Sequence, residues 1–308
     1  MTKKIEESLE KIPILNWLVR LGKKIKIPGL LGMSLYDVIE MYVIGIVKGA
    51  LTSRAGGIAF SLFMALFPFI LFILTLIPYV PIEGFQEDFL IMIEQLLPPN
   101  TAETVHDVIE DIANTRYSGL LSFGFIASIF LMTNGVNAIL GGFEYSYHVT
   151  EMRSIIRQYF ISMIMSIMLS LILVVTVAIT LYFEIGINDL KAKGWLEDDV
   201  FWIEKGQFLF FILLIFISVS LLYKYGTKEV KYFSFFTPGS ILTTLLTIVM
   251  FKLFSMYVLK FATYNQLYGS IGTLLVLMLF VWLNSIILLL GFELNASISR
   301  LKRFHIKV

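Results

Sequence analysis

Cysteine is missing altogether from this chain of 308 residues, which excludes disulfides, thiolate metal sites and cysteine nucleophiles. Histidine is scarce, and His106, His148 and His305 do not stand at the spacing of zinc ligands. The sequence also lacks a phosphate-binding glycine loop of the Walker type and a nucleophile elbow. We therefore predict no catalytic residues, no metal and no cofactor, and a protein that is not an enzyme.

Charge is also in short supply, at 15% of residues against about 25% in soluble domains. Hydrophobic residues make up 57% of the chain, and the mean hydropathy is +0.83. This balance excludes a soluble core and predicts an all-α polytopic membrane protein. Its basic residues gather at the edges of apolar runs, where topology or anionic lipid accounts for them. We therefore expect membrane lipids as partners and no binding of nucleic acid, while the oligomeric state stays open.

Six apolar runs have about the length that a membrane-crossing helix needs, roughly 17 to 25 residues. The expected spans are about 56–80, 120–143, 159–183, 207–223, 238–259 and 270–296. Lysine and arginine are dense in alternate connections, which predicts both termini on the cytoplasmic side. The remaining segments are a cytosolic tail at 1–33, a helical extracytoplasmic cap at 81–117, a second outer loop at 184–203 and a basic tail at 301–308. The membrane domain as a whole covers 34–300.

Two local features of the first third of the chain each have two interpretations. The segment from Ser34 to Ala50 has the periodicity of an amphipathic helix. It could lie in the membrane interface or pack beneath the domain, and the pattern does not decide between them. Pro68 lies inside the first expected span and should kink it, either as an accommodated proline or as part of a gate.

Polar side chains follow one face of the second and the sixth expected spans. Residues of this kind are rare in lipid and should face other helices or a cavity. The candidates for a polar intramembrane face or a lipid-binding site are Asn134, Asn137, Glu144, Asn284 and Asn295. They could form hydrogen bonds between helices, or they could line a conduit, and the sequence leaves both interpretations open.

Glu293 lies near the cytoplasmic end of the last span, on the side opposite Asn284 at 100° per residue. A buried carboxylate there needs a cationic partner or a proton. We expect an ion pair with Arg153, because both residues lie at the cytoplasmic ends of polar helices. A carboxylate that takes up a proton is the alternative.

Three segments resemble the BrkB/YihY family of bacterial inner-membrane proteins. They are SRAGGIAFSLFMALFPFILFILTLIPY, TNGVNAILGGFEYSYHVTEMRSIIRQYF and GSIGTLLVLMLFVWLNSIILLLGFELNA. The most specific positions are Ser61 with Phe67-Pro68, Asn137 with Glu151 and Arg153, and Trp282 with Gly291, Glu293, Leu294, Asn295 and Ala296. The resemblance implies a six-helix protein of the bacterial inner membrane. The family's old ribonuclease label finds no support in these residues, whereas its association with envelope integrity and lipid-precursor export fits a polar intramembrane face.

Two functional hypotheses follow from these residues and this resemblance. In the first, the protein assists the movement or export of an amphipathic lipid or envelope precursor, with envelope lipid-export proteins as partners. In the second, it is a structural partner in an envelope-maintenance complex and transports nothing. A cavity lined by Asn134, Asn137 and Asn284 would favour the first hypothesis, and a tightly packed bundle would favour the second.

Overall fold

The computed structural model describes residues 21–26, 34–76, 120–195, 199–228, 235–260 and 270–306. Within these ranges the chain is helical, and the single β feature is an isolated bridge between Lys26 and Ser34. The helices are α3 (Leu35–Lys48), α4 (Leu51–Leu76), α7 (Leu120–Glu144), α8 (Ile155–Ala192), α9 (Asp199–Tyr225), α10 (Pro238–Lys260) and α12 (Ser270–Ile306). The predicted all-α class is confirmed.

Five helices of the described residues are long and apolar enough to cross a membrane. They contain Ile126–Glu144, Ile155–Lys191, Phe201–Tyr225, Pro238–Val258 and Leu274–Arg303. A sixth crossing is reached if α3 and the start of α4, which are bent by 64° at their junction, form one broken span. The structure therefore agrees with a polytopic membrane protein. The expected cap at 81–117 and most of the expected tail at 1–33 lie outside the described residues.

Most of the described part of the expected second outer loop at 184–203 is helical, while its position outside the membrane stays a prediction. Helix α8 continues to Ala192, and α9 begins at Asp199. The segment contains no proline, and an i,i+4 pair between Lys193 and Asp189 at 2.5 Å adds support at its surface. Helix α8 ends where Gly194 adopts φ +72° and the Trp195 N–H reaches back to the Leu190 carbonyl, as a glycine-terminated helix does. The expected basic tail at 301–308 is likewise largely helical, because α12 runs on to Ile306.

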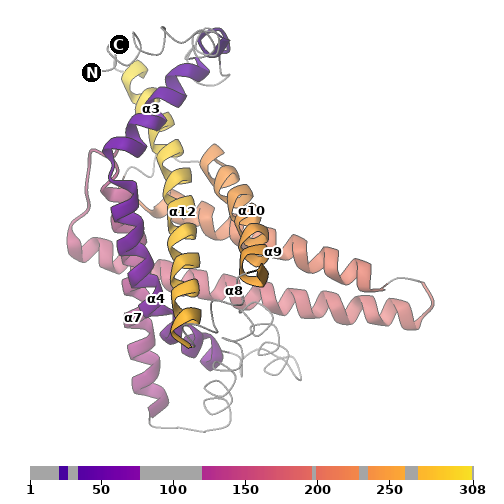
Figure 1. The fold of residues 1–308 in the computed structure, drawn as a ribbon. Coiled ribbons are helices and arrows are strands. Elements are labelled where there is room, and N and C mark those ends of the chain that lie inside the picture. Colours follow the sequence, from indigo (N-terminus) through magenta and orange to yellow (C-terminus); the bar gives the residue numbers. More distant parts are fainter. Residues whose placement is uncertain are drawn as a thin grey trace.

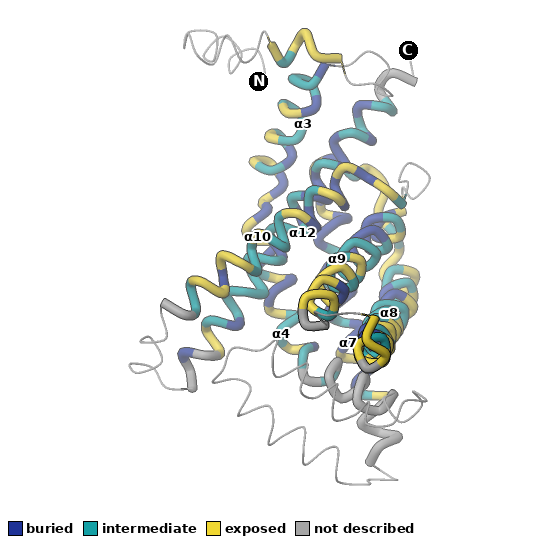
Figure 2. The backbone as a smooth tube through the Cα atoms, turned by 90° about the vertical axis from the view of Figure 1, so that its right-hand side faces the viewer, coloured by how far each residue is buried: buried dark blue, intermediate teal, exposed yellow. Residues whose placement is uncertain are grey.

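Helices α4, α7 and α12 run together, and the antiparallel pair α8–α9 crosses them steeply (Figures 1 and 2). Helix α10 packs along α12 and also contacts α9. The core between these helices is aromatic at its centre, where the rings of Phe143 and Phe292 stack with centroids 4.3 Å apart. Tyr223 of α9 packs edge-on against the Phe143 ring and is fully buried. Helices α7, α9 and α12 are thereby fixed to one another near one end of the bundle.

Helix α3 turns away from α4 at a short break and packs against the last turns of α12 (Figure 1). Ser34 begins α3 with a capping box to Asp37, and Ala50 at φ 46° separates α3 from α4. Val38 is buried against Leu301, in line with the packed alternative. On another side of α3 three apolar side chains remain exposed: Ile39, Val43 and Val47. An interfacial position for this second face stays a prediction.

Candidate functional site

A buried ion pair lies where α3, α4, α7 and α12 meet. Glu293 of α12 has no exposed side-chain surface, and its Oε1 lies 2.5 Å from Nη2 of Arg54, whose side chain is 8% exposed. The hydroxyl of Ser146 donates to the other carboxylate oxygen at 2.9 Å. Nη1 of Arg54 donates to the Gly142 carbonyl in the last turn of α7 at 2.7 Å. The carboxylate is thus neutralised and hydrogen-bonded on both oxygens, which a buried charge requires.

Two glycines let α3 cover this pair at close range. A Cβ added at Gly45 would lie 2.6 Å from Nε2 of His148 and 2.8 Å from Oε2 of Glu293. One added at Gly49 would lie 2.8 Å from Nη2 of Arg54. These separations are shorter than side-chain atoms adopt, so only glycine permits the approach at either position. Helix α3 therefore shields the pair from solvent.

His148 links α3 to α12 beside the same carboxylate and is fully buried. Its Nε2 lies 2.9 Å from the Met41 carbonyl, and its Nδ1 lies 3.3 Å from Nη1 of Arg300. A carbonyl only accepts and a guanidinium only donates, so the ring proton is assigned to Nε2. Burial lowers the pKa of His148, with Glu293 opposing that effect and Arg300 adding to it. His148 is therefore neutral at pH 7 and acts as a hydrogen-bonded link between helices.

The structure corrects the ion pair that we expected between Arg153 and Glu293. Arg153 instead lies beside Glu144, with Nε 3.9 Å from Oε1 and its backbone N–H donating to both carboxylate oxygens at 3.3 Å. Its Nη2 also donates to the Thr227 carbonyl after α9. Glu144 is the last residue of α7, and Arg153 lies in the connection that follows it. The two residues are therefore close in the chain as well as in the fold. The side of α12 that carries Glu293 faces the start of α4, where Arg54 is the nearest cation.

A cavity of about 600 Å³ adjoins the ion pair at the end of the bundle where α4 and α8 begin and α7 ends. Its polar lining residues are Arg54, Ser61, Asn137, Glu144, Arg153 and Gln158. Three large side chains that also line it are strongly exposed: Tyr145 at 69%, Met152 at 56% and Ile155 at 87%. We call this space the arginine cavity. It combines a polar interior with an apolar rim.

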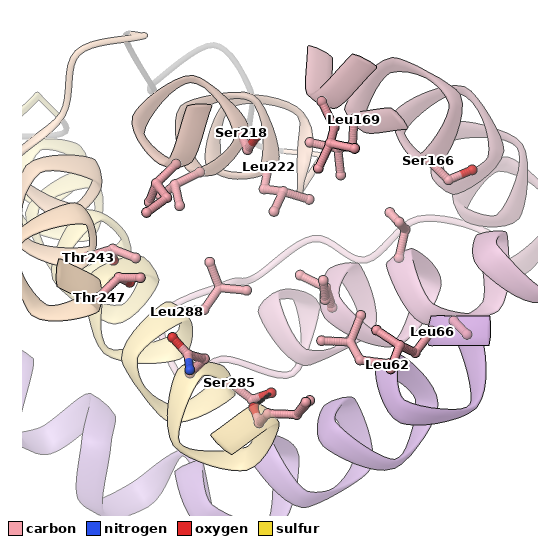
Figure 3. A pocket seen from close by; sticks show the side chains of 18 of the residues that line it. Leu62, Leu66, Ser166, Leu169, Ser218, Leu222, Thr243, Thr247, Ser285 and Leu288 are labelled. Carbon is pink, nitrogen blue, oxygen red and sulfur yellow. Dashed lines mark hydrogen bonds between the residues drawn. The ribbon is translucent and has the colours of Figure 1, made fainter. Parts of the chain in front are cut away.

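A second cavity, of about 470 Å³, lies inside the bundle and is lined by residues of α4, α7, α8, α9, α10 and α12. Figure 3 shows leucines from several of these helices pointing into it, with hydroxyl side chains between them. Polar groups in its wall include Ser166, Ser218, Thr243, Thr247, Asn284 and Ser285. We call this space the central cavity. Its lining is otherwise aliphatic and aromatic.

The five residues of the predicted polar face do not form one surface. Asn137 accepts from the Ser162 hydroxyl at 3.2 Å and lines the arginine cavity together with Glu144. Asn284 lines the central cavity, and its amide donates to the Phe280 carbonyl of its own helix. Asn295 is buried and joins α12 to the start of α10, accepting from the Gly239 N–H and donating to the Thr237 hydroxyl, both at 2.8 Å. Asn134 is partly buried and lines neither cavity.

Three contributors to the site were not among the predicted residues: Arg54, Ser146 and His148. Arg54 carried a usable signal, since an arginine at the entrance of an apolar run must find an acceptor. Pro68 lies inside α4, as expected, and the helix continues on both sides of it. Among the residues that the structure describes, no group of three or more histidine or acidic side chains could hold a metal ion.

Comparison with known proteins gives one family and three relatives of similar length. Residues 45–307 match the family described as virulence factor BrkB. The chain is 33% identical over 264 residues to a ribonuclease-like protein, YfkH, of Bacillus subtilis (strain 168), covering 82% of this chain and 91% of that protein. It is 24% identical to a UPF0761 membrane protein of Pseudoalteromonas translucida, covering 84% of each, and 23% identical to one of Vibrio parahaemolyticus, covering 80% and 76%. No solved structure matches.

Proposed function

The chain belongs to the family described as virulence factor BrkB, and from that premise we propose that it binds an amphipathic lipid inside the membrane and assists its movement or export. The protein would lie in the bacterial inner membrane with both termini cytoplasmic. Its partners would be membrane lipids and envelope lipid-export proteins. The observation that carries this proposal is the central cavity, to which six helices contribute.

The size and lining of the central cavity favour a lipid chain over water or a small polar solute. Its volume of about 470 Å³ falls in the range of ligand pockets, roughly 300 to 1,000 Å³. Apolar cavities of this kind stay dry or take up apolar ligands, because water finds too few hydrogen-bonding partners in them. The hydroxyls and Asn284 supply a few polar contacts along an otherwise apolar path. Such a wall suits a molecule that is mostly hydrocarbon and partly polar.

A structural role in an envelope-maintenance complex is the second candidate, and two residues favour it. Asn295 and Glu293 are used entirely in joining helices, as in a protein whose task is to hold a shape. The ribonuclease-like name belongs to the Bacillus subtilis relative and is not carried over to this chain. That the chain is not an enzyme stays a prediction.

The test fills the central cavity without altering an ion pair. Ser218 lines the cavity from α9, so Ser218→Phe should occupy much of it. Leu213→Phe on the same helix is the matched control, because Leu213 is 42% exposed and does not line the cavity. In vesicles with fluorescent lipid, the wild type and Leu213→Phe should speed transbilayer movement, and Ser218→Phe should not. A wild type that leaves the rate unchanged while it rescues envelope defects in cells would favour the structural role.

A further inference from the structure

The arginine cavity contains cationic donors that the protein itself does not use. The side chains of Arg54 and Arg153 are 8% and 4% exposed, and both line the cavity. Nε of Arg54 and Nη1 of Arg153 are buried and have no hydrogen-bond partner. An orphaned buried donor destabilises the fold, and more so when it belongs to a charged group. Orphaned donors on two arginines at one cavity call for an acceptor that binds there.

The two nearby carboxylates, those of Glu293 and Glu144, do not satisfy these orphaned donors. Glu293 is saturated by Arg54 and Ser146 and does not line the cavity. Glu144 does line it, but its oxygens accept from the Arg153 backbone N–H, and its 3.9 Å separation from Nε of Arg153 is too long for a hydrogen bond. Planar guanidinium groups match the oxygens of phosphate particularly well. A phosphate-bearing group between Arg54 and Arg153 would thus supply acceptors that the carboxylates do not.

The rim of the cavity indicates what the phosphate is attached to. Tyr145 and Met152 lie in the connection between the candidate spans that end at Glu144 and begin at Ile155, and the side chains of all three residues are exposed. At this end of the bundle they would adjoin the membrane interface, within reach of the acyl chains of a bound lipid. A free phosphate ion gains nothing from such a rim, whereas acyl chains would pack against it. We propose that the arginine cavity binds the anionic headgroup of a phospholipid, with its acyl chains leaving past Tyr145, Met152 and Ile155. This inference rests on the proposed function in taking the ligand to be a lipid, and it adds that the lipid headgroup is anionic.

A glycine pair in α4 provides a variant and its control. Gly57 lines the cavity, and a Cβ there would meet no atom within 4 Å, so Gly57→Leu should fill the space without disturbing either ion pair. Gly56 also has no atom within 4 Å of an added Cβ but does not line the cavity, so Gly56→Leu is the matched control. Both changes favour the helix, because leucine is a much better helix former than glycine.

Native mass spectrometry of the delipidated protein in neutral detergent would measure binding of phosphatidylglycerol, phosphatidylcholine and inorganic phosphate. We expect at least about tenfold preference for phosphatidylglycerol over phosphatidylcholine, equivalent to about 1.4 kcal/mol. Gly57→Leu should lose at least tenfold in phosphatidylglycerol binding, and Gly56→Leu should bind like the wild type. If Gly57→Leu fails to fold, Ile155→Glu takes its place, since Ile155 is 87% exposed and the new charge should repel the headgroup.

Three results would overturn the headgroup site: equal binding of the two lipids, unchanged binding by Gly57→Leu, or equal losses in Gly57→Leu and Gly56→Leu. Inorganic phosphate that displaces phosphatidylglycerol and binds with the same affinity would indicate a free-phosphate site and overturn the lipid part. Transbilayer movement is measured separately. Selective binding without movement would therefore refute the proposed function and leave the headgroup site standing.

Discussion

Replacing Glu293 with glutamine tests the buried junction most directly. The change leaves the Arg54 guanidinium, 8% exposed, without its counter-charge in a place that α3 covers. Breaking a buried pair from one side costs about 3–5 kcal/mol. A glutamine oxygen can still accept one bond from Arg54 or Ser146, so we expect a loss near 3 kcal/mol, at the lower end of that range. Because the pair is buried, added salt should change this loss little.

The assay is a double-mutant cycle in detergent, read as the free energy of unfolding and as protein abundance in the membrane. Glu293→Gln and Arg54→Gln should each destabilise, and the double variant should lose clearly less than the sum of the two. Combining Glu293→Gln with Arg153→Gln should give simple addition, because Arg153 lies against Glu144. Full stability of Glu293→Gln, or rescue by Arg153→Gln instead of Arg54→Gln, would refute the assignment of partners.

Three further predictions concern the helix contacts and His148. In a detergent titration, Asn295→Leu should lower the free energy of unfolding by about 1–3 kcal/mol, because it leaves the Gly239 N–H without its acceptor. Asn284→Leu should cost less than about 1 kcal/mol in the same titration, because the hydrogen bond of Asn284 lies within α12. Gly291→Ala should destabilise the protein by about 1–3 kcal/mol or more, since its Cβ would collide with Thr243 and Tyr223. Gly56→Ala, the control, should be neutral or stabilising. Thermal unfolding of Gly291→Ala at the wild-type temperature would contradict the packing. Burial lowers the pKa of His148 in the folded protein, so the unfolded chain takes up its proton first and thermal stability should fall as pH drops below about 6.5 toward that lowered pKa. Glu293, Arg300 and Arg303 face this histidine, and His148→Gln should remove most of the fall; an unchanged pH profile in this variant would refute its source.

Sequence patterns predicted the helices well because bilayer thickness and side-chain polarity act locally along the chain. The start of α10 at Pro238 and the start of α12 at Ser270 coincide with the expected boundaries. The extension of α8 was missed because its polar end resembles a loop in hydropathy. Nothing there breaks a helix before Gly194, and charges such as Asp189 and Lys193 pair on a helix surface without cost.

The candidate site was harder to predict, because its contacts join residues that no local pattern relates. Helical geometry placed Asn284 and Asn295 on one side of α12, yet the first faces a cavity and the second binds α10. Their different neighbours depend on where α10 begins beside Asn295 and on where the six helices leave the central cavity beside Asn284, which the sequence of α12 does not contain. The partner of Glu293 was misassigned for the same reason, since Arg54 is 239 residues away.

That separation bears on how the protein is made. Translation adds roughly 5–20 residues per second, so Arg54 emerges about 12–48 s before its partner Glu293, which lies 239 residues later. During that interval the nascent chain holds an arginine at the mouth of its first long apolar helix, with the Gly142 carbonyl of α7 as the earlier of its two acceptors to be synthesised. Closure of the junction must therefore be among the last steps of assembly. Chains that end before Glu293 would keep an arginine without its carboxylate partner.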